Sequence, residues 1–321
     1  MQQCKSCLLP ETHETIQYDK KGSCNICSQH SYKNEIINWD KKNEQLKDII
    51  KQHKNKYDYD CIVPFSGGKD STYTLWYLKK ILNLKCLVVT FDHGFYRPKL
   101  IENRERTFKI LGVDSINFTP NWELVKRLML ESLIRKGDFC WHCHSGIFSY
   151  PMHIAIKFNV PLIVWGETQA EYTAYYSYKD TEEQNEEVDE KRFNRFINLG
   201  VTADDMYLRL NGEVEKRDLL PFSYPHIEML KKIKSKSVCL GSYISWNPKK
   251  QSELIKKELG WKGDEVENVP PEYDYEKIEC YMQGVRDYIK YLKRGYSRPS
   301  HLSAIDLRNK VITKEKAKEN I

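Results

Sequence analysis

Short apolar runs alternate with amphipathic stretches through the middle of the chain, from Tyr59 to about residue 245. The runs that predict strands are Cys61–Phe65, Cys86–Phe91, Ile116–Thr119, Leu162–Trp165 and Val238–Leu240. The stretches with helical spacing are Ser71–Leu82, Leu100–Leu111 and Trp122–Arg135. Because strands alternate with helices of this length, we expect an α/β fold with a doubly wound parallel sheet, covered by helices on both faces.

Changes in residue composition and hydrophobic pattern divide the chain into four predicted parts. These are a cysteine-rich module at 1–31, an amphipathic linker helix at 32–56, an α/β domain at 57–245 and a helical region at 246–321. Within the α/β domain, residues 171–206 are rich in tyrosine and then acidic, and they lack clear periodicity. We interpret them as an insertion over the sheet that could act as a lid.

The helical C-terminal region is amphipathic and basic. Its apolar face, which we expect to pack on the core, consists of Tyr281, Val285, Tyr288, Ile289 and Leu292. Its cations are Arg286, Lys290, Lys293, Arg294 and Arg298. They could bind a nucleotide diphosphate or a partner, and a solvated helical face is the simpler expectation.

Composition narrows the classes of function. The 321 residues are 40% hydrophobic and 30% charged, with a formal net charge of +6. This charge permits an anionic ligand but is too small to predict nucleic-acid binding. No apolar run reaches the length of a membrane span, and the start Met1–Cys4 lacks a signal-peptide pattern, so we expect a cytoplasmic protein. The ten cysteines are therefore read as thiols or metal ligands.

The loop Ser66-Gly67-Gly68-Lys69-Asp70-Ser71 lies between a predicted buried strand, ending at Phe65, and a predicted helix. Two glycines let the backbone approach an anion, and N–H groups at a helix start point toward it. The hydroxyls of Ser66 and Ser71 and the charge of Lys69 suit phosphate, while Asp70 suits Mg²⁺. The spacing is not that of a Walker A loop, because Val63 and Asp70 occupy positions where that motif has glycine and serine or threonine.

Other candidate ligands follow the neighbouring strands. Phe91 could support adenine and Asp92 could bind a ribose hydroxyl, since ligands bind beyond the carboxyl ends of parallel strands. Gly166, Glu167 and Thr168 follow another strand, and Glu167 could face substrate or Mg²⁺. The alternative for Phe91 and Asp92 is an ordinary turn that ends the strand. The alternative for Glu167 is a solvated loop carboxylate. Tyr172 could stack on a sugar ring, or it could be an ordinary surface tyrosine.

The cysteines form pairs with metal-ligand spacing. Cys4, Cys7, Cys24 and Cys27 make two Cys-x-x-Cys pairs 16 residues apart, which predicts a structural four-cysteine zinc ribbon. Cys140 and Cys143 form a third pair, which could bind metal, act in redox chemistry or pack as thiols. Its third ligand could be Cys239 or Cys280.

The phosphate loop resembles the PP-loop of the ATP pyrophosphatases, which cleave ATP between the α and β phosphates. Longer strings resemble the bacterial N-acetyl sugar amidotransferases of surface-glycan biosynthesis, which act on lipopolysaccharide O-antigen sugars or on pseudaminic and legionaminic acids. These strings are Val63–Thr72, Cys140–Ile147, Pro161–Glu167, Ser242–Trp246 and Lys277–Cys280. Ser245 and Asn247 depart from the pattern of that family.

The resemblance implies a reaction and its partners. ATP with Mg²⁺ would adenylate the acetamido oxygen of an N-acetyl sugar, expected to be nucleotide-linked, and ammonia would displace AMP. Lys69 and Asp70 would be the catalytic residues, and residues Phe65 to Ser71, Phe91, Asp92 and Gly166 would bind ATP. Residue 2 is Gln2 rather than a catalytic cysteine, so we expect ammonia from solution or from glutaminase and cyclase-like subunits.

Two other functions remain open at this stage. A PP-loop tRNA-thiolating enzyme would use Cys140, Cys143 and a third cysteine to hold an iron–sulfur cluster, although the acidic stretch Glu182–Glu190 would repel RNA phosphates. A non-catalytic zinc-ribbon adaptor would have a vestigial nucleotide loop, and the intact Lys69-Asp70 pair argues against it.

Overall fold

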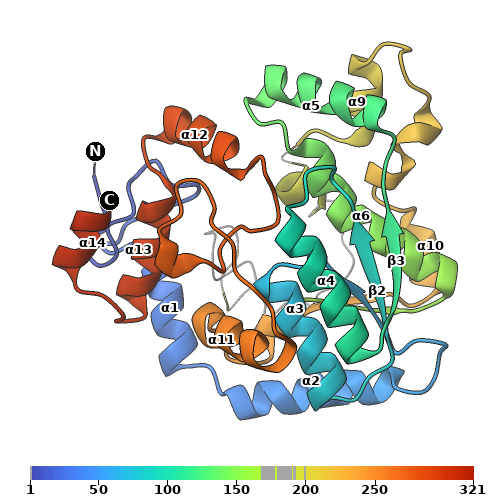
Figure 1. Ribbon diagram of the computed structural model, residues 1–321, viewed down its shortest axis with the longest axis horizontal. Coiled ribbons are helices and arrows are strands. Elements are labelled where there is room, and N and C mark those ends of the chain that lie inside the picture. The colour runs from blue at the N-terminus through green and yellow to red at the C-terminus, as the bar shows by residue number, and fades with distance from the viewer. Residues whose placement is uncertain (1, 168–177, 179–189, 191–192, 199) are drawn as a thin grey trace.

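The centre of the protein is a sheet of five parallel strands (Figure 1). The computed structural model describes residues 2–167, 178, 190, 193–198 and 200–321. The strands are β1 (Cys61–Pro64), β2 (Cys86–Phe91), β3 (Asp114–Phe118), β4 (Leu162–Trp165) and β5 (Lys236–Cys239). Their order, β3-β2-β1-β4-β5, reverses direction between β1 and β4, which makes this the switch point of the sheet. The predicted fold class, an α/β protein with a doubly wound parallel sheet, is confirmed.

Helices connect and cover the strands. The α-helices are α1 (Asn25–Glu35), α2 (Trp39–His53), α3 (Lys69–Trp76), α4 (Pro98–Leu111), α5 (Trp122–Lys136), α6 (Trp141–Phe158), α9 (Ala203–Arg209), α10 (Ile227–Lys232), α11 (Pro248–Leu259), α12 (Gln283–Arg294), α13 (Arg298–Arg308) and α14 (Lys314–Asn320). Shorter helical segments are η1 (Tyr77–Ile81), η3 (Phe193–Ile197), η4 (Lys216–Phe222), η5 (Leu240–Ser242) and η6 (Pro271–Tyr273). Within the described ranges, none of the helices combines the length and apolar character needed to cross a membrane.

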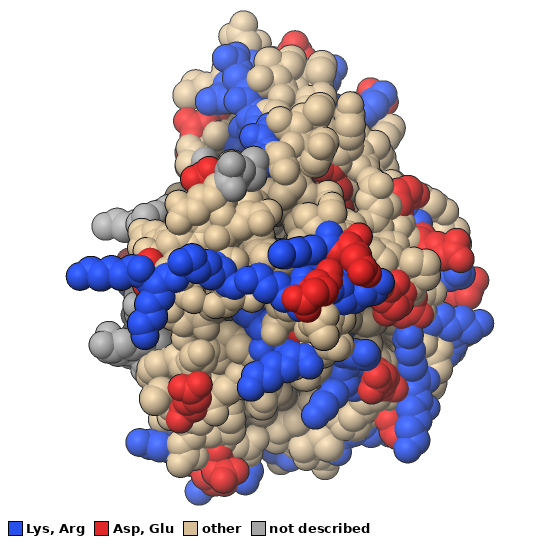
Figure 2. Space-filling view, turned by 90° about the vertical axis from the view of Figure 1, so that its left-hand side faces the viewer, with Lys and Arg blue, Asp and Glu red and all other residues tan. Residues whose placement is uncertain are grey.

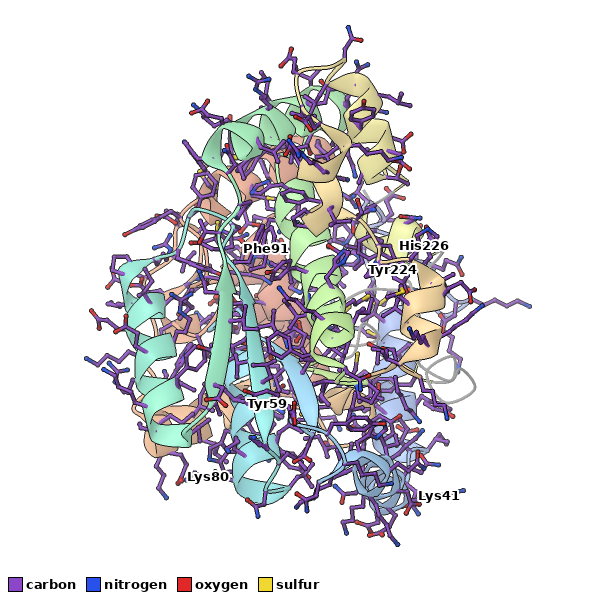
Figure 3. All side chains as sticks on the ribbon, turned by 90° about the vertical axis from the view of Figure 1, so that its right-hand side faces the viewer. Lys41, Tyr59, Lys80, Phe91, Tyr224 and His226 are labelled. Carbon is purple, nitrogen blue, oxygen red and sulfur yellow. The ribbon has the colours of Figure 1, made fainter. Side chains whose placement is uncertain are left out.

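Successive side chains of each strand point to opposite faces of the sheet, so a hydrophobic core forms on each face. In β1, Cys61 and Val63 face one core while Ile62 faces the other, as expected from a side-chain period of two. The larger core packs the sheet against α2, α3, α4 and α11. The smaller one packs it against α6 and α10, which lie on the opposite face in Figures 1 and 3. Burial on both faces explains why β1, β2 and β4 read as continuous apolar runs.

The two ends of the chain meet on one side of the sheet. Figure 1 shows the N-terminal module beside α13 and α14, with both termini close together. Leu9 and Ile26 of the module pack in one apolar cluster with Ala304 of α13. Lys314 Nζ donates a hydrogen bond to the carbonyl of Lys5 at 2.9 Å. On this face, Lys and Arg side chains form a band across the middle, with acidic side chains beside it (Figure 2).

Helix α12 has the opposite orientation to the one predicted. Four residues of its apolar stripe are about half exposed or more: Tyr281 (51%), Val285 (49%), Tyr288 (59%) and Leu292 (65%). The opposite side of the helix carries the buried Gln283 and Asp287 and turns its cations toward the interior. The expectation that the apolar face packs on the core was therefore wrong, because amphipathicity fixes the separation of the two faces but not which one faces inward.

Candidate active site

The glycine-rich loop occupies the position that the sequence predicted, between β1 and α3 at the switch point of the sheet. Gly67 has a φ of +92°, a conformation that residues with a side chain rarely adopt. Gly68 precedes the first turn of α3, so backbone N–H groups of that turn face the space beyond the strand ends. The loop therefore has the backbone geometry of an anion cradle.

Serine hydroxyls shape the loop from inside. The Ser71 hydroxyl accepts hydrogen bonds from the N–H groups of Ser66, at 3.3 Å, and Gly67, at 3.1 Å. The Ser66 hydroxyl accepts one from the N–H of Gly68 at 3.2 Å. Trp261, which follows α11, donates its indole N–H to the carbonyl of Gly67 at 3.1 Å. The sequence predicted phosphate contacts for these serines, and the structure adds that they hold the loop in shape.

Lys69 is a buried cation between two carboxylates. Its Nζ lies 2.9 Å from Asp70 Oδ2 and 2.9 Å from Glu276 Oε1, and the residue is 5% exposed. Glu279 packs directly on Gly68, where a Cβ atom would clash with its carboxylate. The segment Glu276–Cys280 therefore closes over the loop. Sequence reasoning gave Glu276 and Glu279 no role, and Glu279 lay only within a resemblance string.

Asp70 and Glu167 form a pair of carboxylates beside Lys69. Burial, and next the charge of Asp70, raise the pKa of Glu167 to about 7. Asp70 Oδ1 is buried and has no hydrogen-bond partner among the described residues. Gly166 brings β4 against α3, since a Cβ there would lie 3.1 Å from Thr74 Oγ1 and 3.4 Å from the Asp70 carbonyl. Two carboxylates with an unpaired oxygen fit a hard cation such as Mg²⁺.

The other predicted nucleotide contacts have mixed outcomes. Phe91 lies at the opposite end of the sheet from Tyr59 (Figure 3). Its ring is 3% exposed and packs on Gly146 of α6 and on Phe222, so it belongs to the core and does not support adenine as predicted. Phe65 is also a core residue, packed on Phe108.

Asp92 stays at the carboxyl end of β2. It accepts hydrogen bonds from the Gly94 N–H at 2.8 Å and from the Thr119 hydroxyl at 3.2 Å, which fixes the turn. Its ribose contact stays a prediction. Thr168 and Tyr172 lie outside the described residues, as does most of the predicted insertion 171–206.

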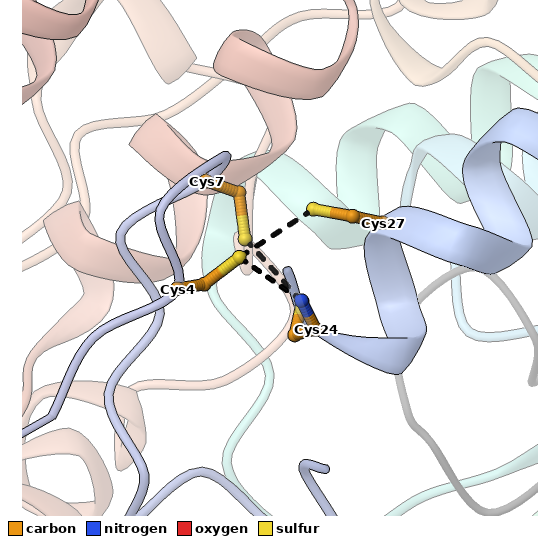
Figure 4. Close-up of side chains that lie close together, drawn as sticks. All are labelled: Cys4, Cys7, Cys24 and Cys27. Atoms are coloured by element: carbon orange, nitrogen blue, oxygen red, sulfur yellow. Dashed lines mark hydrogen bonds between the residues drawn. The ribbon is translucent and has the colours of Figure 1, made fainter. Parts of the chain in front are cut away.

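The four N-terminal cysteines lie close enough together to hold a metal ion (Figure 4). All four sulfurs lie within 4.8 Å of one another, with 3.6 Å between those of Cys7 and Cys24 and 3.9 Å between those of Cys4 and Cys27. A tetrahedral ion with metal–sulfur bonds of ~2.3 Å needs sulfurs ~3.8 Å apart. The N–H groups of Ser6 and Cys24 point at the Cys4 sulfur, at 3.4 and 3.2 Å. The predicted ligand set is thus assembled.

A second group of cysteines lies near the loop. Cys140 and Cys143 lie at the start of α6, buried and half-buried respectively, and burial raises the pKa of Cys140 to about 12. The charge of Cys280 contributes to the raised pKa values of both thiols, so Cys280 is the predicted third cysteine that lies near them. Arg286 is close to Cys140 and Cys143 and favours their thiolate forms. Cys239 is in β5, opposite Trp165 of β4.

A cavity of about 300 Å³ connects the loop to the C-terminal helices. Lys69, Asp70, Glu167 and Glu276 line one part of it. The cations of α12 and α13 line the other, and His13 and Glu14 of the N-terminal module complete the wall. Residues from both ends of the chain therefore surround a single site.

Comparisons with known proteins place few limits on the function. No protein-family model matches the chain. It is 32% identical over 166 residues to the uncharacterized protein MJ1599 of Methanocaldococcus jannaschii, a match over 51% of this chain and 58% of that protein. The chain thus spans little more than half the length of this relative.

A solved structure is also similar over most of the chain. It is the U34-tRNA thiolase NcsA from Methanococcus maripaludis with its [4Fe-4S] cluster, at 14% identity and a TM-score of 0.35, covering 97% of this chain and 87% of that one. A TM-score this low supports no conclusion about the fold or the function of this chain. The fold therefore rests on the strand order and the loop described above.

We predict that the N-terminal cysteines hold one zinc ion per chain and that Cys24→Ser releases it. Structural zinc contributes on the order of 10 kcal/mol in isolated zinc-finger peptides, so its loss should unfold the module. Metal analysis and hydrogen exchange of residues 2–31 would measure both effects. Cys239→Ser, which alters a thiol elsewhere, is the matched control and should keep the metal. A fully ordered, zinc-free Cys24→Ser protein would contradict the prediction.

The raised pKa of Glu167 predicts a pH effect on stability without added magnesium. Between its ordinary value of 4.5 and about 7, the folded protein binds a proton that the unfolded chain has lost. The free energy of unfolding should therefore fall as pH rises through this window, by at most about 3 kcal/mol. Glu167→Gln should remove this slope in urea unfolding, whereas the exposed control Glu123→Gln should keep it. Equal slopes in all three proteins would contradict the assignment.

Proposed function

We propose that this protein is an ATP-dependent enzyme that adenylates an amide oxygen and releases pyrophosphate. The observation that carries the proposal is the β1–α3 loop, with buried Lys69 beside the Asp70 and Glu167 carboxylates. The loop N–H groups would hold the phosphates, and Lys69 would offset charge on the departing pyrophosphate. Mg²⁺ held by Asp70 and Glu167 would supply further neutralisation of phosphate charge.

The amide that we propose is the acetamido group of an N-acetyl sugar. Support comes from the resemblance strings, because four of them, far apart in sequence, meet around the loop. Gly166 contacts Asp70, Glu279 contacts Gly68, and Cys280 lies near Cys140 and Cys143. A cavity of about 300 Å³ beside the loop provides the concave site that such an acceptor needs.

The proposed reaction balances in two steps. The acetamido oxygen attacks the α-phosphorus of ATP, and the bond to the β-phosphate breaks to release pyrophosphate. Ammonia then adds to the acetamido carbon, and the carbon–oxygen bond breaks to release AMP and a protonated acetamidino sugar. Adenylation is needed because an amide oxygen is a poor leaving group. The nitrogen would come from solution or from a glutaminase-like partner.

The test combines pyrophosphate release with product mass. We expect purified protein with ATP, Mg²⁺, ammonia and candidate acetamido sugars to release pyrophosphate and to give a product about one mass unit lighter, since NH replaces O. Lys69→Gln should lower the rate about 100-fold or more, because a preorganised charge is lost from the transition state. The exposed control Lys47→Gln should match wild type. Equal rates for Lys69→Gln and wild type would instead support a non-catalytic adaptor.

A second candidate function, sulfur transfer to tRNA, is favoured by the cysteine group. It would share the adenylation step. Cys140, Cys143 and Cys280 influence one another electrostatically and lie beside Arg286, and they would supply three ligands of an iron–sulfur cluster. Such a cluster would leave one iron open to carry a sulfur atom.

Anaerobic purification separates the two functions. The thiolation hypothesis predicts about four iron and four sulfide per chain, lost in Cys140→Ser and Cys280→Ser but kept in Cys239→Ser, together with firm tRNA binding. Iron with tight tRNA binding and no amidine product would replace our proposal. Protein without iron that binds no tRNA would remove the thiolation alternative.

A further inference from the structure

The part of the cavity wall that α12 and α13 supply is rich in cations. It contains Arg286, Lys290, Lys293, Arg294 and Arg298, from α12 and α13. These are the cations for which the sequence predicted a solvated face. Their helix instead exposes its tyrosines and Leu292 to solvent. Turning cations inward and apolar side chains outward is unfavourable unless the cations meet negative charge.

Most of these cations have a partner within the protein. Arg298 makes a bidentate pair with Asp287, at 2.7 and 3.1 Å, and both side chains are buried. Arg286 lies 3.7 Å from Asp138, and Arg294 pairs with Glu14. Lys293 Nζ donates to the carbonyls of Lys136 and Gly137, at 3.1 and 3.2 Å. These contacts fix the four side chains around the cavity.

Lys290 differs from its neighbours. No ion pair within 4 Å joins it to a carboxylate of the described residues, and its Nζ lies 4.8 Å from the centre of the Tyr296 ring. Burial, and next the charge of Arg298, lower the pKa of Lys290 to about 8. The part of the wall around this ammonium carries five cations against three carboxylates, those of Glu14, Asp138 and Asp287, so positive charge is in excess there. An incoming anion would relieve this excess.

We propose that Lys290, with the flanking Arg286 and Arg298, binds the diphosphate group of a nucleotide-linked acceptor sugar. The inference rests on the proposed function and names the substrate class of the same cavity. The carboxylates beside Lys69 suit a hard cation, whereas the α12 wall suits phosphate oxygens. The acceptor would thus lie across the cavity, with its acetamido group at the loop and its diphosphate at Lys290. A free sugar, which has no charge, would lose this contact.

Pyrophosphate is a suitable probe for the diphosphate when the phosphate loop is already filled. In calorimetry with saturating α,β-methylene-ATP and Mg²⁺, we expect wild-type protein to bind one pyrophosphate. Lys290→Gln should weaken this binding at least about tenfold, the loss expected when one charged hydrogen bond is removed. Lys290→Arg should restore it. The exposed control Lys47→Gln should behave as wild type.

The outcomes separate this inference from the proposed function. If the analogue binds but pyrophosphate does not, or binds equally to wild type and Lys290→Gln, the diphosphate assignment is overturned. If the analogue fails to bind while pyrophosphate binding still depends on Lys290, the ATP site is wrong and the anion site stands. If bulk tRNA binds in a Lys290-dependent manner and pyrophosphate does not, the cations serve RNA and the inference is also overturned. Circular dichroism of each variant would show that it is folded.

Discussion

The arrangement of the site depends on the burial of one ammonium group, that of Lys69. A buried cation is stable only when it is paired, and removing one partner of a buried pair costs about 3–5 kcal/mol. One partner, Asp70, is its neighbour in sequence, but the other, Glu276, lies more than 200 residues away. The ion pairs therefore tie the phosphate loop to the C-terminal region. Glu279 on Gly68 and Trp261 on Gly67 reinforce the same connection.

This connection gives the cavity two chemically different ends. Carboxylates gather around Lys69, and cations gather on the inner side of α12. Each set of charges is costly without a ligand, because burial and then like charge raise the pKa of Glu167 and lower that of Lys290. A cation at one end and an anion at the other would satisfy both. A metal ion and phosphate groups are the ligands that we propose for these two sets of charges.

The sequence predicted the features that depend on local patterns. The strands are continuous apolar runs because both faces of the sheet are buried, and the glycine loop is recognisable because its conformation requires glycine at Gly67. The four metal-site cysteines were recognisable by spacing. Features that depend on distant contacts were missed. Nothing local marks Glu276 as the partner of Lys69, and nothing distinguishes Cys280 from Cys239 before the chain is folded.

Two errors have the same physical origin. Phe91 ends a strand beside candidate ligands, but the side-chain alternation of β2 and the close approach of Gly146 direct its ring into the core. The stripe of α12 has the spacing of a core-facing helix, but the charges inside the cavity determine which side turns inward. In both cases the sequence identified the strand or helix correctly but not the direction in which its side chains face, because tertiary neighbours decide that direction.

The cysteine module has a consequence for the order in which the protein is completed. During synthesis the module is made long before α13, yet Leu9 and Ile26 pack with Ala304, and His13 stacks on Tyr296 and His301. The sheet and its loop can form before α12 and α13 have been synthesised, but the wall of the cavity, which includes these helices, cannot. The cavity is thus complete only after segments far apart in sequence have packed together, a slow kind of contact to form.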